Sequence, residues 1–315
     1  MLTAKLFTLF TSDVTKVAMM VNAMSAMASA FTILFLFWTI TYIAKKVFGK
    51  NDDELTLANK IVILGAGLVG ALVYTFSDTF WFSAVEGEVY AYSSLFTALV
   101  FWLILKWEEN ADNPGSDRWL ILIAYLMGLS IGVHLLNLLA IPAIVLVYYY
   151  KKYTPSVKGF IIALIASMGI LAFAQYGLIP EFVDWAARFE LFFVNTLGMS
   201  YNSGLFIYIF LVIASMAWAI YETHANKNYT RMIIAYVLSV TLAGIPFLGG
   251  SIVLGILIIL AMIWFFFRRK KKVEARWLNT SILMVAVMLI GYSSYAVIVI
   301  RSSAQPTMDQ NSPDN

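Results

Sequence analysis

The chain has 315 residues, of which 61% are hydrophobic and 12% charged, and its mean hydropathy is +0.82. A soluble domain has about 25% charged residues, so this composition excludes a soluble globular protein and indicates a helical membrane protein. The net charge of +3 does not suggest a nucleic-acid partner, because the basic residues lie in short connections between apolar runs. The absence of cysteine excludes disulfides and a cysteine nucleophile, and two distant histidines do not suggest a metal site.

A spanning helix needs about 20 apolar residues. Residues 1–16 precede the first such run and begin as an amphipathic helix. Residues 17–300 are predicted to form an all-α, polytopic transmembrane bundle, with an amphipathic helix at the outer interface over residues 180–198. The sequence predicts about ten spans, at residues 17–44, 61–77, 90–106, 119–134, 136–150, 159–179, 204–221, 232–248, 250–267 and 277–300.

The distribution of lysine and arginine orients these spans. Seventeen of the 21 basic residues fall on one side, which the positive-inside rule makes cytoplasmic. Residues 119–150 are interpreted as two helices joined by a tight turn near residues 134–137, because a single span there would weaken this asymmetry. The four basic residues on the outer side are Lys5, Lys16, Arg188 and Arg301.

Both ends of the chain are then expected outside the membrane. Residues 1–16 lack the basic start and separate apolar core of a signal peptide. We therefore expect at least one further span before Met1, of which residues 1–16 would be a remnant. Residues 301–315 are expected to form a polar extracytoplasmic tail or the start of a domain that continues past Asn315.

Residues 65–70 match the G-x-G-x-x-G pattern of dinucleotide-binding folds. That fold also needs a strand–helix–strand unit in an aqueous domain. Here the sequence continues directly into another apolar run. Small residues let membrane helices approach closely, so the motif predicts helix packing.

Two carboxylates, Glu86 and Glu88, lie in an aromatic-rich loop, residues 80–92, between two predicted spans. A carboxylate at the bilayer centre costs about 2.5–3.5 kcal/mol, so paired acids beside a membrane need an explanation. At i,i+2 they point apart on a helix but to one side of an extended loop. Asp78 nearby favours a site for a metal or a cationic group. A solvated loop that merely marks the outer side is the alternative.

Other polar residues flank the predicted outer helix ends. Tyr90 follows Glu86 by four residues, so its phenol could donate a hydrogen bond to that acid if the next helix begins early. His134 is either a satisfied hydrogen-bonding residue in apolar surroundings or, with Asn137 one turn away, binds a lipid phosphate or hydroxyl. Arg301 follows the last span, as a snorkelling anchor or as a planar phosphate clamp.

Residues 80–92, 132–137 and 295–306 resemble those of bacterial, Bacteroidota-type relatives of the vertebrate transmembrane O-mannosyltransferase family, in the C-type glycosyltransferase superfamily. The resemblance implies a multi-pass inner-membrane enzyme. It would transfer a sugar such as mannose from a polyprenyl-phosphate carrier to a protein hydroxyl at the extracytoplasmic face. Its partners would be membrane lipid, the lipid-linked sugar and a protein acceptor. No other cofactor is certain, and a divalent cation stays open.

The resemblance also assigns roles. Glu86 and Glu88 match a second, supporting acidic loop of the catalytic site, and the principal base would lie on a first loop before Met1. The chain is therefore expected to be truncated at both ends and inactive alone. The residues that the resemblance and the sequence favour for substrate binding are Tyr90, His134, Asn137 and Arg301.

Two other classes fit a polytopic membrane protein. A transporter usually buries ionisable residues in mid-span, whereas no Asp, Glu, Lys or Arg lies in the interior of a predicted span. A non-catalytic envelope assembly protein would leave Glu86 and Glu88 dispensable.

Overall fold

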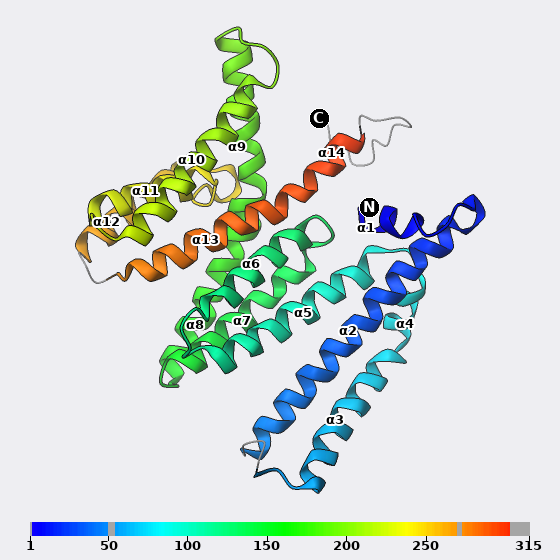
Figure 1. Cartoon of the computed structure of the whole chain (residues 1–315). Helices are drawn as coiled ribbons and strands as arrows, with labels where there is room; N and C mark the ends of the chain where they lie inside the picture. Colours follow the sequence, from blue (N-terminus) through cyan, green and yellow to red (C-terminus); the bar gives the residue numbers. More distant parts are fainter. Residues whose placement is uncertain (1, 50–53, 270–272, 303–315) are drawn as a thin grey trace. The chain divides into compact units, whose positions relative to one another are not determined.

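The computed structural model describes residues 2–49, 54–269 and 273–302, and every regular element within these ranges is a helix (Figure 1). The predicted all-α polytopic fold is thereby confirmed. Three of the ten predicted spans correspond to shorter helices, which are Asp117–Ile131, Tyr229–Leu242 and Ile252–Arg268. Seven helical stretches are long and apolar enough to cross a membrane: Val14–Phe48, Leu57–Thr75, Val89–Asn110, Leu135–Lys152, Val157–Thr196, Ser203–Ala225 and Ala275–Ser302.

The chain divides into two compact units. The first comprises residues 1–151 and 288–315, and the second comprises residues 152–287. The predicted polar tail, from residue 303 onward, lies outside the described residues. The elements of the first unit are α1 (Leu2–Thr8), η1 (Val14–Lys16), α2 (Val17–Phe48), α3 (Leu57–Thr75), α4 (Asp78–Val85), α5 (Val89–Asn110), α6 (Asp117–Ile131), η3 (Leu135–Ala140), α7 (Ile141–Lys152), η7 (Ser293–Tyr295) and α14 (Ala296–Ser302).

Helices α2 and α3 form an antiparallel hairpin (Figure 1). A Cβ added to Gly67 would lie 2.5 Å from Thr41 Cγ2, and one added to Gly70 would lie 2.6 Å from Ile40 Cδ1. A Cβ on Gly65 would meet nothing within 4 Å. Two of the three motif glycines therefore let α3 approach α2, which confirms the packing interpretation of residues 65–70.

Helix α5 is well buried in the first unit. Its side chains Val100, Ile104 and Trp107 are almost fully covered by the neighbouring helices. Helix α3 instead exposes Leu68 and Val69. Such an apolar outer face is expected of a helix that contacts lipid. Helix α5 instead packs its side chains against the other helices of the unit.

The second unit contains a helical stretch that runs on further than predicted. Residues Val157–Thr196 continue through two π-helical segments, and the first of these precedes Pro180. Proline lacks the N–H that an α-helix needs, and a π-type segment accommodates such an interruption. The elements of this unit are α8 (Val157–Ala172), η4 (Phe173–Leu178), α9 (Ile179–Leu191), η5 (Phe192–Thr196), α10 (Ser203–Ala225), α11 (Tyr229–Leu242), η6 (Leu248–Gly250), α12 (Ile252–Arg268) and α13 (Ala275–Tyr292), whose last turns belong to the first unit.

These longer helices correct one sequence-based statement. Glu181 is 5% exposed and lies within Val157–Thr196, so an ionisable group does occur inside a potential span. Glu222, near the end of α10, is also buried and pairs with Arg231 Nη2 at 2.5 Å. The prediction that no charged residue lies inside a span was wrong, because the helical stretch Val157–Thr196 and α10 both extend past the predicted span ends. The interfacial position of residues 180–198 stays a prediction.

Candidate active site

Residues 86–88, the acidic loop, connect α4 to α5. Helix α4 takes up much of the aromatic stretch that the sequence predicted to be a loop. Asp78 lies in its first turn, where a carboxylate interacts favourably with the helix dipole. The connection is consequently only a few residues long, and Glu88 immediately precedes α5.

Both acids have extended backbone, with φ and ψ of −102° and 144° at Glu86 and −102° and 170° at Glu88. The backbone nevertheless bends at residues 86–88, so the expectation that the two carboxylates share one side of the loop stays a prediction. Both side chains are exposed. Within the part of the chain that the structure describes, neither carboxylate has an ion-pair or hydrogen-bond partner. Their charges are therefore available to a ligand.

Gly87 holds the acidic loop against α2. A Cβ at this position would lie 2.9 Å from Val21 Cγ1 and 3.1 Å from Asn22 Oδ1. Such separations are too short for a side chain, so the loop can approach α2 this closely because residue 87 is glycine. The contact also brings Asn22 to the acids. Sequence reasoning missed Asn22, whose one signal was an amide in the second turn of a long apolar helix.

Tyr90 lies in the first turn of α5 and contacts His134 across the unit. Their ring centroids are 5.6 Å apart, with an interplanar angle of 50°. The suggested hydrogen bond from the Tyr90 phenol to Glu86 is not formed, because α5 begins at Val89 and the two residues do not share a helix. Two of the predicted substrate-binding residues are thus brought together in a different arrangement.

His134 stands at the turn between α6 and η3, as the hairpin interpretation predicted. Its Nδ1 accepts a hydrogen bond from the backbone N–H of Leu136 at 3.1 Å. A neutral imidazole with an accepting Nδ1 carries its proton on Nε2. The half-buried ring can therefore offer an Nε2–H donor to a ligand.

Asn137 plays a more internal part than predicted. It is 0% exposed, and its Nδ2 donates to Ser130 Oγ at 3.1 Å. Its Oδ1 is buried without a hydrogen-bond partner among the described residues. Asn137 therefore ties η3 back to α6 below His134, and reaches a ligand only through an opening of this turn.

The last helical segment approaches the same turn. A Cβ on Gly132 would lie 2.9 Å from Ser294 Oγ in η7. Helix α14 follows η7 directly, and Arg301 lies near its end, roughly 9 Å beyond Tyr295 at about 1.5 Å per residue. The structure places the start of α14 beside the His134 turn and Arg301 further along the helix.

The acids do not form a metal cluster with their neighbours. Within residues 2–49, 54–269 and 273–302, no three His, Asp or Glu side chains gather closely enough to hold a metal ion. Asp78 is therefore not a third ligand beside Glu86 and Glu88. What the site offers is two exposed carboxylates on a fixed loop, and a tyrosine–histidine pair at the start of the next helix.

Comparison with known proteins gives a family match over the region that contains these residues. Residues 1–157 match the family model of the protein O-mannosyl-transferase TMEM260 N-terminal domain. The matched region, just under half of the chain, contains the acidic loop, Tyr90, His134 and Asn137. No curated protein and no solved structure gave a significant match. Residues 1–157 are thus similar to that domain, and the match supports a membrane glycosyltransferase-like function.

Proposed function

We propose that this protein transfers a sugar, mannose in the first instance, from a polyprenyl-phosphate donor to a hydroxyl of a protein acceptor. The acidic loop faces the extracytoplasmic side of a bacterial inner membrane, as the lysine and arginine distribution favours. The observation that carries the proposal is the match over residues 1–157, because it includes the loop whose two carboxylates have no partner among the described residues.

In the proposed reaction, the acceptor oxygen forms a bond to the anomeric carbon of the sugar. The bond from that carbon to the phosphate oxygen breaks, and its electron pair leaves with the lipid phosphate. A carboxylate takes the proton of the acceptor hydroxyl, since an alcohol is a weak nucleophile without a base. Glu86 and Glu88 support this step by orienting the hydroxyl and stabilising positive charge at the sugar ring.

The departing phosphate needs donors that act as its negative charge develops. His134 is suited to this role because its Nε2–H is left free for a ligand by the bond that Nδ1 accepts. Tyr90 packs against the imidazole and restricts its orientation. Arg301 supplies a guanidinium at the end of α14, and its planar donors suit a phosphate.

The test is sugar transfer by the protein expressed from its complete coding region in bacterial membranes. Radiolabelled polyprenyl-phosphate mannose and a panel of secreted acceptor proteins are the substrates. We expect Glu86→Gln and Glu88→Gln each to reduce transfer roughly 10-fold or more, as a fraction of the 10²–10⁴-fold contributed by acid–base groups. Glu274→Gln, at an exposed acid of the second unit, serves as the control and should transfer normally.

The outcomes separate the competing classes. Undiminished transfer by both Glu86→Gln and Glu88→Gln would show that these acids take no part in catalysis, although the protein would still be a glycosyltransferase. No transfer from any polyprenyl-linked sugar moves the protein to the transport or assembly class. A parallel reaction with a chelator determines whether a divalent cation takes part.

A further inference from the structure

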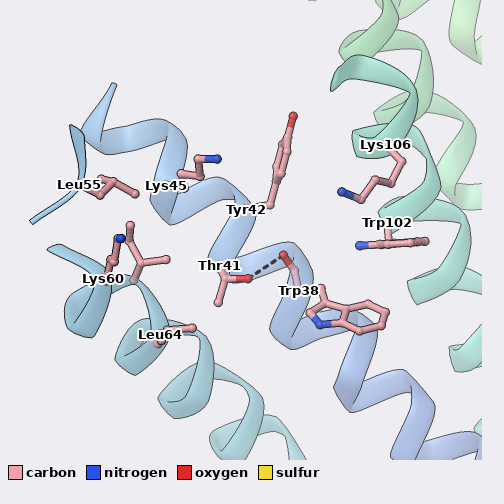
Figure 2. A pocket seen from close by; sticks show the side chains of 10 residues that line it. Trp38, Thr41, Tyr42, Lys45, Leu55, Lys60, Leu64, Trp102 and Lys106 are labelled. Atoms are coloured by element: carbon pink, nitrogen blue, oxygen red, sulfur yellow. Dashed lines mark hydrogen bonds between the residues drawn. The ribbon is translucent and has the colours of Figure 1, made fainter. Parts of the chain in front are cut away.

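A hollow lies in the first unit, where α2 ends, α3 begins and α5 ends. Its volume is about 450 Å³. Figure 2 shows that its lining side chains come from these helices and from Leu55, two residues before α3. We call it the lysine pocket, and its lining residues are Trp38, Thr41, Tyr42, Lys45, Leu55, Lys60, Ile63, Leu64, Trp102 and Lys106.

Aromatic rings form one wall of the lysine pocket. The centroids of Trp38 and Trp102 are 5.3 Å apart, and Phe35 packs within 5.5 Å of Trp38 and 5.4 Å of Trp102. These three rings hold α2 against α5. Trp38 remains 38% exposed, so part of this apolar wall is open to a ligand.

Among the residues that the structure describes, the lining of the lysine pocket includes three cations and no acidic side chain. Two acids of α5 lie close to it. Glu108 pairs with Lys46, which is outside the lining, and accepts a hydrogen bond from the phenol of the lining residue Tyr42 at 3.2 Å. Glu109 pairs with the lining residue Lys106 at 2.8 Å and offsets part of its charge. Lys106 also stands 5.6 Å from the centroid of the Trp102 ring.

Lys60 adds charge from the opposite side of the lysine pocket. It is exposed in the first turn of α3, where the helix dipole is also positive, and it has no ion pair among the described residues. Lys45 and Lys106 lie near the ends of the other two helices. The lysine pocket therefore concentrates positive charge from three separate helices.

This hollow lies at the other end of the helices from the acidic loop. Along α5, Lys106 is roughly 24 Å from Tyr90 at a rise of about 1.5 Å per residue. That length is close to the hydrocarbon thickness of a bilayer, about 30 Å. The lysine pocket is consequently expected at the depth of lipid headgroups, with the exposed Leu64 of α3 continuing toward the acyl chains.

We propose that the lysine pocket binds an anionic phospholipid. The headgroup phosphate lies among Lys45, Lys60 and Lys106, and an acyl chain runs along Trp38 and Leu64. A soluble phosphate would meet the same lysines but would leave the apolar wall unused. The combination of an aromatic wall, an open apolar edge and clustered lysines favours the lipid.

The binding test uses the purified protein in phosphatidylcholine vesicles that contain increasing amounts of phosphatidylglycerol with brominated acyl chains. Bromine quenches nearby tryptophan, so a bound lipid is detected as quenching that saturates at low mole fraction. The variant with Trp38→Phe and Trp102→Phe identifies the pocket's share of the signal among the nine tryptophans. We expect that variant to lose the saturable component.

Charge variants test the phosphate site. Replacing Lys45, Lys60 and Lys106 together by Ala should raise the half-saturating mole fraction more than 10-fold, and Lys60→Ala alone about 5-fold, given the usual contribution of a lysine beside an anionic surface. Lys158→Ala is the matched control, because Lys158 is an exposed lysine in the first turn of another apolar helix. It should leave the curve unchanged.

Several results would overturn the proposal. The Lys60 side chain is exposed, so the Lys60→Ala variant should fold. An unchanged quenching curve for this variant would contradict the site, even if the triple variant is unstable. Equal saturable quenching by brominated phosphatidylcholine removes the preference for an anionic headgroup. Displacement of the lipid by millimolar inorganic phosphate or glycerol 3-phosphate shows a site for soluble phosphate and not for lipid.

Discussion

The two ends of the helices in the first unit use charge in opposite ways. At one end, Glu86 and Glu88 stand on a short extended loop without partners among the described residues. At the other end, Glu108 and Glu109 are both engaged by lysines. Charges without a partner among the described residues, such as Glu86, Glu88 and Lys60, indicate where a ligand can supply the counter-charge.

The same helix connects these two regions. Helix α5 begins directly after Glu88 and carries Lys106 in its last turns, so one helix contributes to both regions. The pairs at the lysine-rich end are partly exposed, and such pairs contribute about 0–1 kcal/mol. Their main effect is to position side chains. The acidic end depends instead on backbone geometry, and this difference can be tested.

The largest effect is expected from Gly87→Ala, which leaves both carboxylates in place. The added methyl group would overlap Val21 and Asn22 and push the acidic loop from α2. A displacement of about 1 Å in a catalytic group can cost roughly 100-fold, so we expect transfer to fall between about 10- and 100-fold. The measurement is kcat for sugar transfer under saturating donor.

Two controls define that result. Gly65→Ala, where an added methyl group meets nothing within 4 Å, should retain full transfer. Combining Gly87→Ala with Val21→Ala should recover part of the activity, because the second change removes the closest atom. Normal transfer by Gly87→Ala alone would show that the position of the loop does not matter.

The hairpin of α2 and α3 carries a second, smaller effect, on stability. Gly67→Ala would place a methyl group 2.5 Å from Thr41 Cγ2, and overpacking of this kind costs about 1–3 kcal/mol. We expect a lower Tm in detergent for this variant, measured by circular dichroism. Gly65→Ala should be unchanged or slightly stabilised, as alanine is favoured over glycine in helices. Equal Tm values would contradict the close contact of α3 with α2.

Local sequence patterns predicted much of this molecule. Apolar runs gave the helices, small residues at 67 and 70 gave the packing of α3 on α2, and charge distribution gave the turn at His134. Each of these signals depends on residues that are close together in the chain.

Features that depend on distant residues were not predicted. Asn22 reaches the acidic loop through Gly87, and Tyr90 meets His134 from another helix. The lysine pocket is the clearest case, because Lys45, Lys60 and Lys106 belong to separate helices and resemble ordinary cytoplasmic anchors when they are considered singly. A single sequence does not show which residues that are distant in the chain lie close together in the fold.

Asp13 offers the finest test, because it is an acid at the same end of α2 as the acidic loop but serves local structure. Its Oδ1 accepts bonds from the Thr15 hydroxyl at 2.7 Å and the Thr15 N–H at 2.9 Å, and Lys16 lies 3.5 Å from Oδ2. The bonds from Thr15 hold the pKa of the Asp13 carboxyl below its usual value. The stabilisation is complete above the pKa of the unfolded chain, near 3.9.

As pH falls through the lower folded pKa, Asp13 is protonated and this stabilisation is lost. Thr15→Val removes the hydroxyl donor but keeps the backbone N–H, so the pKa of Asp13 should rise part of the way toward its usual value. The measurement is a ¹³C carboxyl titration in micelles, with the Asp13 signal assigned through Asp13→Asn. Thr8→Val should not move that signal, since Thr8 donates to the Lys5 carbonyl. An Asp13 pKa unaffected by Thr15→Val would show that the acid is no more committed to local structure than Glu86 and Glu88.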